Sequence, residues 1–212
     1  GNEDCLYLDI FAPKKTEDNP LPVMFWIHGG GNTSGLKDLY DFSKVVSKHE
    51  VIVVRINYRL GPFGWFTHPA IQQFQSGEDK SSNFGTLDII MALKWVRDNI
   101  SNFGGDPNNV TIFGESAGGH NVLSLIASRK AKGLFHKAIS MSGYTTSVSK
   151  DDAYNPKTES SISKYSSFSV TNKLKQKFNL NDFSGDNQIL KEREMLLSIS
   201  TEDFFKIYSE RD

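Results

Sequence analysis

Short runs of apolar residues predict strands along much of the chain. Residues Tyr7–Pro13 alternate apolar and polar positions and stop at a proline, which is typical of a strand near a sheet edge. Residues Val23–Ile27 are continuously apolar and Val51–Arg59 are rich in β-branched residues, as in strands that are buried on both faces. Val110–Phe113 and Lys137–Gly143 add two further predicted strands.

Between these runs the apolar period changes to that of a helix. Helical spacing connects four apolar positions after Thr86, which are Ile89, Leu93, Val96 and Ile100. A second helix is predicted over Ala117–Ser128, directly after the strand at Val110–Phe113. Because strands and helices alternate, the pattern predicts an α/β fold with a mostly parallel twisted sheet and flanking helices.

After Gly143 the composition shifts toward Ser, Lys, Asp and Asn, and no strand is evident. Helical spacing returns near the end of the chain, with Ser200 or Thr201 as the predicted N-cap of the last helix. We therefore interpret residues 1–143 as the N-terminal part of an α/β core. Residues 144–212 are interpreted as a helical elaboration of the same, incomplete domain.

Composition and charge exclude several classes of protein. Hydrophobic residues make up 38% and charged residues 23% of the 212 residues, as in ordinary globular proteins. The formal net charge of −1 predicts no nucleic acid partner, and no apolar stretch is long enough for a transmembrane segment. Cys5 is the only cysteine, so we expect no disulfide within the chain and no metal cluster built on thiolates.

A serine flanked by glycines stands between a predicted strand and a predicted helix. The segment Gly114-Glu115-Ser116-Ala117-Gly118 fits the Gly-x-Ser-x-Gly pattern, in which a sharp turn exposes a serine hydroxyl and small neighbours prevent collisions. The helix that follows directs its first amides toward developing negative charge. The alternative is a tight turn that contains a serine by chance, but the strand before it and the helix after it favour a nucleophile.

A run of three glycines follows the strand at Val23–Ile27, in the sequence His28-Gly29-Gly30-Gly31. Consecutive glycines let the backbone approach a ligand and direct N–H groups into a pocket. A flexible turn is the alternative explanation. Beside a nucleophilic serine, however, such a loop is typical of an oxyanion hole.

Several segments together resemble the type-B carboxylesterase family, the cholinesterase-like branch of the α/β-hydrolase fold. The resemblance rests on EDCLYLDIF, PVMFWIHGGG, VVRINYRLGPFGWF, NFGTLDIIMALKWVRDNISNFGGDPNNVTIFGESAGG and KAISMSG, in this order over residues 3 to 143. It implies an α/β-hydrolase core of which this chain is the N-terminal portion. It also implies hydrolysis of small-molecule carboxylic esters through an acyl-enzyme, without a cofactor.

The resemblance assigns roles to individual residues. It implies that Ser116 is the nucleophile and that Gly30, Gly31 and Ala117 donate to the oxyanion. Glu115 would be a buried carboxylate beside the nucleophile, and Gly29 and Asn32 would line the binding site. The family's structural salt bridge would be formed here by Arg59 and Asp88.

The chain departs from the family pattern at several positions. Asn32 stands where an aromatic residue usually follows the third glycine, so the wall of the acyl pocket is expected to differ. Thr86 and Ile89 replace the usual leucine and glutamine at the start of a helix. Cys5 matches a cysteine that many relatives pair with an upstream partner, and this chain contains no second cysteine.

The base that would activate Ser116 is not evident. In this fold the order is serine, acid, histidine, and only His120 and His136 follow Ser116. We expect His120 to project from the helix and His136 to lie near the surface, while His28 orients the glycine loop. We therefore expect this chain to be an N-terminal portion that precedes the acid and the histidine, with little activity by itself.

Two other functions stay open at this stage. A cholinesterase-like binding or adhesion module without catalysis is one, although such relatives usually lose the serine. A lipase or thioesterase on the same scaffold is the other, and a metal site is not expected. The resemblance favours a secreted or periplasmic protein, the single cysteine leaves a cytoplasmic one open, and the sequence does not indicate the oligomeric state.

Overall fold

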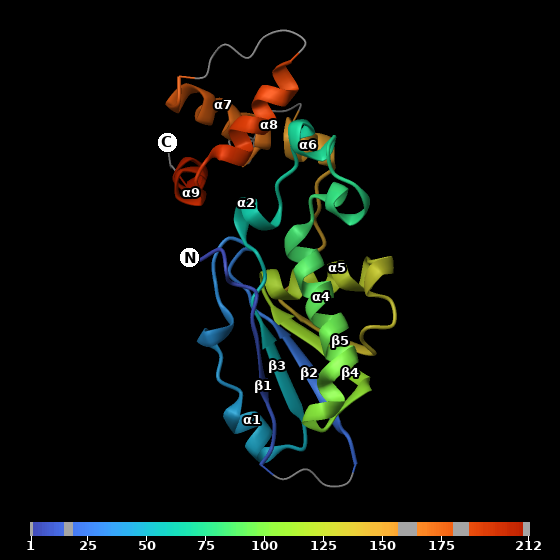
Figure 1. The fold of residues 1–212 in the computed structure, drawn as a ribbon. Helices are drawn as coiled ribbons and strands as arrows, with labels where there is room; N and C mark the ends of the chain where they lie inside the picture. Colours follow the sequence, from blue (N-terminus) through green and yellow to red (C-terminus); the bar gives the residue numbers. More distant parts are fainter. Residues whose placement is uncertain (1, 15–18, 157–164, 180–186, 210–212) are drawn as a thin grey trace. The chain divides into compact units, whose positions relative to one another are not determined.

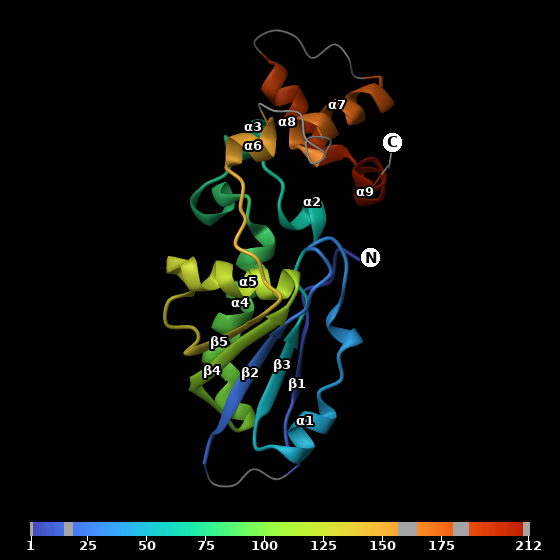
Figure 2. The same cartoon turned by 180° about the vertical axis from the view of Figure 1, so that it is seen from behind.

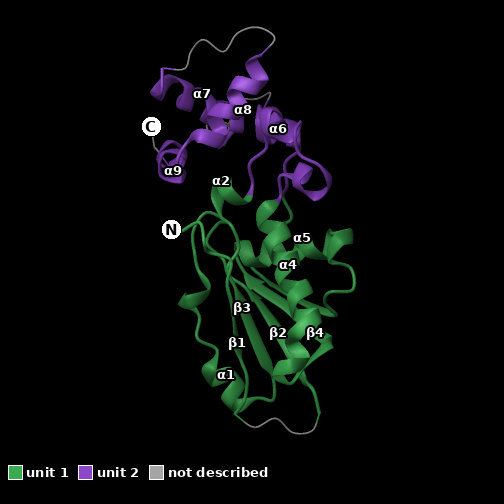
Figure 3. Cartoon of the chain, in the orientation of Figure 1, with its two compact units in different colours: residues 1–64, 84–146 green, residues 65–83, 147–212 purple. Residues whose placement is uncertain are grey.

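The described residues form two compact units. A computed structural model of the chain describes residues 2–14, 19–156, 165–179 and 187–209 (Figure 1). One unit contains residues 1–64 and 84–146, and the other contains residues 65–83 and 147–212 (Figure 3). Residues 65–83, which we had placed in the first part, group with the later helices. Whether the division predicted at residue 143 separates parts of one domain stays a prediction.

The first unit is built on a sheet in the order β1-β3-β2-β4-β5 (Figure 1). Its strands are β1 (Leu8–Phe11), β2 (Leu21–Ile27), β3 (Ile52–Ile56), β4 (Gly105–Glu115) and β5 (Lys137–Met141). Strand β1 is antiparallel to β3 at one edge, and all the other pairs are parallel. The predicted mostly parallel sheet is therefore confirmed.

The apolar runs explain which strands lie in the middle. Strand β2 pairs with both β3 and β4, and Val23, Phe25 and Ile27 are completely buried. Strand β3 is likewise buried, because it lies between β1 and β2. Continuous apolar sequence thus corresponds to strands covered on both faces, as expected.

Strand β4 is longer than the predicted run of four residues. It begins at Gly105, which pairs with Leu21, and the register shifts between Leu21 and Val23. A Cβ on Gly105 would come within 2.9 Å of side-chain atoms of Ile100 and Val23. Glycine at this position therefore lets the strand begin directly after the preceding helical turn.

Helices cover both faces of the sheet. The helices of the first unit are α1 (Ser43–Lys48), α2 (Gly61–Gly64), α4 (Phe84–Asn99) and α5 (Ala117–Ala127). Helix α1 contributes Val46 to an apolar cluster with Trp26, Val53 and Phe113. Helix α4 lies across the sheet in Figure 1, and Figure 2 shows the sheet from behind. The four predicted apolar positions of this helical segment, Ile89 to Ile100, are all completely buried.

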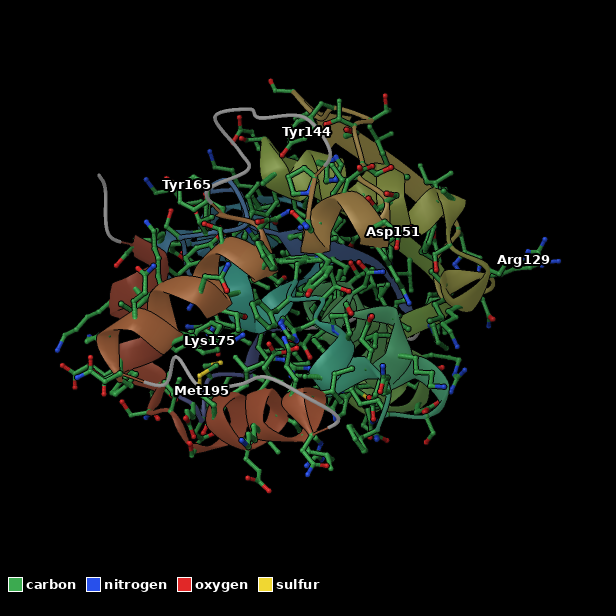
Figure 4. All side chains as sticks on the ribbon, turned by 90° about the horizontal axis from the view of Figure 1, so that it is seen from above. Arg129, Tyr144, Asp151, Tyr165, Lys175 and Met195 are labelled. Atoms are coloured by element: carbon green, nitrogen blue, oxygen red, sulfur yellow. The ribbon has the colours of Figure 1, made fainter. Side chains whose placement is uncertain are left out.

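The second unit is helical in the part that the structure describes. Its helices are α3 (Pro69–Gln72), α6 (Lys150–Tyr154), α7 (Ser167–Lys177), α8 (Gln188–Ser198) and α9 (Thr201–Ser209). Its apolar core includes Leu174 of α7, Met195 of α8 and Ile207 of α9. Figure 4 labels Met195 and the neighbouring Lys175, which forms an ion pair with Glu192 of α8. The Ser200 hydroxyl accepts a hydrogen bond from the Asp203 amide at 3.1 Å, which confirms the predicted N-cap.

The predicted salt bridge connects the segment after β3 to helix α4. The Arg59 guanidinium donates to both oxygens of Asp88 at 2.8 Å, and the Arg59 amide donates to the same carboxylate at 3.0 Å. The Asp88 side chain is 7% exposed and that of Arg59 is 38% exposed. The pair joins the end of β3 to helix α4, as the resemblance implied.

We expect Arg59→Met to destabilise the intact protein by about 2 kcal/mol or more, because the buried Asp88 carboxylate loses its charged partner and keeps only the Arg59 amide. Arg97→Met is the matched control, since Arg97 and Asp98 form an ion pair with both side chains about half exposed. The control should lower the stability much less, because water already surrounds both of its charges. Urea unfolding of the two variants measures the difference, and equal losses would contradict a buried role for Asp88.

His68 is buried in the second unit among aromatic rings. Its Nδ1 accepts a hydrogen bond from the Ala70 amide at 3.2 Å and so caps α3. The rings of Phe66 and Tyr154 lie 6.2 and 5.2 Å away between centroids. Burial lowers the pKa of His68 to about 4, with smaller opposing effects of Glu192, which raises the pKa, and Lys175, which lowers it. The imidazole is therefore neutral in the folded protein.

This burial predicts a pH-dependent stability. Unfolded His68 takes up a proton near pH 6.5 and folded His68 only near pH 4, so the free energy of unfolding should fall by about 3 kcal/mol as the pH drops through this window. His68→Asn keeps a cap acceptor and does not titrate, so it should remove this part of the pH dependence. His49→Asn, at an exposed position, is the control and should leave the fall of the free energy of unfolding with pH unchanged. Urea unfolding at several pH values measures both variants.

Candidate active site

Ser116 occupies a sharp turn between β4 and α5 (Figure 1). Its backbone has φ 57° and ψ −121°, a combination that residues with a side chain rarely adopt. The Ser116 amide donates to the carbonyl of Met141 on β5 at 2.9 Å, and its own carbonyl accepts from the His120 amide at 2.9 Å. The strained turn is thus held from both sides, as expected of a nucleophile presented to substrate.

The glycines on each side of Ser116 are required by contact rather than by flexibility. A Cβ on Gly118 would lie 2.1 Å from the carbonyl oxygen of Ile27, and one on Gly114 would lie 2.5 Å from the carbonyl carbon of Gly118. Neither distance is possible for real atoms, so the start of α5 can approach the ends of β2 and β4 only if both positions are glycine.

The glycine loop lies directly against this turn. A Cβ on Gly29 would be 2.7 Å from the Glu115 carbonyl oxygen and 3.3 Å from Ser116 Cβ. Gly30 and Gly31 follow with φ of 106° and 64°, which glycine adopts without strain. The two segments that the sequence predicted to form one site, about 90 residues apart in the chain, are therefore in contact.

The candidate oxyanion donors are available. Within the described residues, the N–H groups of Gly30 and Gly31 donate to no acceptor, and both residues are exposed. Ala117 is the first residue of α5, so its N–H has no acceptor inside the helix. Helix α5 also adds a partial positive charge at this end. These features fit the predicted roles of Gly30, Gly31 and Ala117, which stay predictions.

His28 supports the loop as we expected. It is 1% exposed, and its Nδ1–H donates to the carbonyl of Gly29 at 2.8 Å. Burial lowers the pKa of His28, so the ring is neutral. The ring stacks on Tyr58 at 4.4 Å between centroids, and the Tyr58 hydroxyl donates to the His28 carbonyl at 2.6 Å. Gly35 fits against the other side, because a Cβ there would lie 2.6 Å from His28 Nδ1.

The Asn32 side chain has hydrogen-bonding neighbours. Its side chain hydrogen-bonds to that of Asn121 on α5, and the Tyr58 hydroxyl lies 3.3 Å from Asn32 Oδ1. Sequence analysis identified neither Tyr58 nor Asn121 as part of the site. The available signal for Asn121 was its position four residues before Leu125, on a face of α5 that is buried.

Glu115 differs from the expectation. The resemblance implied a buried carboxylate, but Glu115 is exposed. It is the last residue of β4 and pairs with Met141 of β5, an edge strand whose five residues are all exposed. Its carboxylate still lies beside the glycine loop, with Oε2 at 3.4 Å from the Cβ position of Gly29.

No histidine in the chain is hydrogen-bonded to the Ser116 side chain, and all five lie in described segments. His120 stacks on Tyr144 at 4.3 Å between centroids, and its Nδ1 contacts the Tyr144 carbonyl oxygen at 2.5 Å. His136 Nδ1 accepts from the Val110 amide at 3.1 Å. Both histidines that follow Ser116 are thus engaged elsewhere, as predicted.

No cluster of three or more His, Cys, Asp or Glu side chains among the described residues is arranged to bind a metal ion. No helix in the described segments has the length and apolar character needed to cross a membrane.

The contact at Gly118 predicts a large effect of a single methyl group. Gly118→Ala should destabilise the intact protein by about 3 kcal/mol or more, because backbone atoms of Ile27 would have to move. Gly77→Ala is the control, since a Cβ at Gly77 meets open space and pays only for φ of 57°, about 1 kcal/mol. Thermal unfolding measures both, and similar losses would show that the close packing at Gly118 is unimportant.

Comparison with known proteins places this geometry in a family. The model of the Carboxylesterase family matches residues 1–201. Para-nitrobenzyl esterase of Bacillus subtilis (strain 168) is 54% identical over 154 residues, which are 72% of this chain and 30% of that protein. Liver carboxylesterase B-1 of Rattus norvegicus is 51% identical over 144 residues, 67% of this chain and 24% of that protein.

Solved structures agree with the predicted fold. A PNB esterase structure superposes with a TM-score of 0.76 at 41% identity, covering 99% of this chain and 39% of that chain. Carboxylesterase EST55 of Geobacillus stearothermophilus gives a TM-score of 0.74 at 34% identity, covering 97% of this chain and 39% of that one. The chain thus has the α/β-hydrolase fold and spans well under half the length of these relatives. It belongs to the carboxylesterase family.

Proposed function

We propose that the protein hydrolyses carboxylic esters and that this chain supplies its nucleophile, Ser116, and its oxyanion hole. The strained backbone of Ser116, in contact with the glycine loop through Gly29, is the observation that carries the proposal. The names of the relatives support the same activity, since they include a para-nitrobenzyl esterase and liver carboxylesterases.

In the proposed mechanism, Ser116 Oγ attacks the carbonyl carbon of the ester while a general base takes its proton. The carbonyl oxygen becomes an oxyanion and accepts hydrogen bonds from the amides of Gly30, Gly31 and Ala117. The alcohol then leaves, and water releases the acid from the acyl-enzyme. Preorganised amides at such a site contribute about 3 kcal/mol each to the stability of the transition state.

We further propose that the general base is none of the histidines of this chain. His28 is buried and neutral beneath the loop, and His120 and His136 contact backbone groups elsewhere. Residues 1–212 alone should therefore hydrolyse esters slowly or not at all.

A fluorophosphonate probe tests the nucleophile in the full-length protein. The probe should label Ser116, and Ser116→Ala should abolish labelling and lower ester hydrolysis by about 10⁴-fold or more. Ser124→Ala, on the same helix, is the matched control and should change both by under about 2-fold. Labelling of the Ser116→Ala protein would mean that another residue is the nucleophile.

Thioester hydrolysis is a second candidate. A relative from Anas platyrhynchos, 50% identical over 143 residues, is named a fatty acyl-CoA hydrolase precursor, medium chain. The same serine can attack the carbonyl carbon of a thioester and expel a thiol, and the same amides can stabilise the oxyanion, because the tetrahedral intermediate is equivalent. The ratio of kcat/KM for an oxygen ester and a thioester with the same acyl group distinguishes the two, and Ser116→Ala should remove both activities.

A further inference from the structure

Two asparagine side chains meet between the glycine loop and the helix that follows the nucleophile. Asn121 Nδ2 donates to Asn32 Oδ1 at 2.9 Å, and Asn32 Nδ2 lies 3.4 Å from Asn121 Oδ1 in the reverse direction. Asn121 is 3% exposed, so water competes little for its amide. A buried amide of this kind is costly unless it is paired, and the pair therefore strongly prefers one arrangement.

Each member of the pair is attached to a different part of the oxyanion hole. Asn32 directly follows Gly31 and has φ of 58°, a backbone conformation that asparagine tolerates better than most residues. Asn121 is on α5, whose first residue is Ala117 and whose N-cap is Ser116. The amide pair thus bridges the loop that holds two proposed donors and the helix that holds the third.

Further contacts hold both ends of the loop. At its start, the Tyr58 hydroxyl donates to the His28 carbonyl at 2.6 Å. At its other end, the Asn32 carbonyl accepts from the Gly61 amide at 2.6 Å, and Tyr58 is also within 3.3 Å of Asn32 Oδ1. Burial raises the pKa of Tyr58, so its hydroxyl remains a donor throughout the physiological range. Gly30 and Gly31, which have free N–H groups, lie between these two anchors.

We propose that Asn32 and Asn121 are positioning residues. They hold the Gly30 and Gly31 amides so that these N–H groups point to the same oxyanion as the Ala117 amide. This inference rests on the proposed function, since it concerns the same oxyanion hole. Glycines are free to adopt many backbone conformations, and oxyanion donors contribute to catalysis only if they are fixed before the charge develops. The asparagine pair fixes them here through the residue that follows Gly31.

Two variants remove one amide each, and Asn121→Leu also removes the hydrogen bond between Asn121 and the Tyr58 hydroxyl. Asn32→Gly keeps a residue that tolerates φ of 58°, and it lies on a partly exposed loop, so the protein should fold. Asn121→Leu replaces a buried amide by an apolar side chain of similar size. For the hydrolysis of a p-nitrophenyl ester by the full-length protein, each should lower kcat by about 10-fold or more while KM changes under about 2-fold.

The double variant tests whether the two side chains act together. Asn32→Gly with Asn121→Leu should lower kcat no further than the single variants, because the bridge is already lost in each. Asn99→Leu is the control, since Asn99 bonds to the Trp95 carbonyl on α4 and should leave kcat unchanged. Unchanged kcat in the single variants, or losses that multiply to about 100-fold in the double variant, would overturn the inference.

The kinetic constants also separate positioning from direct binding. A rise in KM with unchanged kcat would mean that the amides contact the substrate instead, and this too would overturn the inference. Failure of the proposed function has a different signature. In that case the unmodified protein would show no ester hydrolysis that depends on Ser116, whatever residues stand at positions 32 and 121.

Discussion

The close approach of three backbone segments is the constraint on which this structure depends. The ends of β2 and β4, the start of α5 and the glycine loop come together at distances that leave no room for a Cβ at Gly29, Gly114 or Gly118. A side chain at any of these positions would separate the loop from Ser116. The geometry of the proposed oxyanion hole is therefore determined by backbone contact, and the glycines are needed for their small size.

The surrounding sheet holds the strand ends, the start of α5 and the glycine loop in place. Buried apolar residues on both faces of β2 and β3 fix the strand ends, and α4 packs against the sheet through its completely buried positions. The Arg59–Asp88 pair then fastens the segment after β3 to α4. Rigid packing of this kind is what allows a strained residue such as Ser116 to persist, because the rest of the structure determines its backbone.

Hydrogen bonds from polar side chains hold the glycine loop, which apolar packing alone does not fix. Glycine loops are intrinsically mobile, and here His28, Tyr58, Asn32 and Asn121 form a hydrogen-bonded support around Gly30 and Gly31. In this chain, we propose, pairing of the two asparagine amides holds the loop.

The sequence by itself determined the features that depend on local pattern. Apolar runs located the strands, helical spacing identified Ile89, Leu93, Val96 and Ile100 as buried, and the glycines around Ser116 identified the turn. The tertiary structure decided which distant groups meet. Three features could not be predicted: Asn32 contacts Asn121, Tyr58 supports the loop, and Glu115 is exposed beside the edge strand β5. Each depends on partners about 25 to 90 residues away in the chain. Local periodicity reports the environment of a residue, whereas side-chain pairing depends on how strands and helices are brought together.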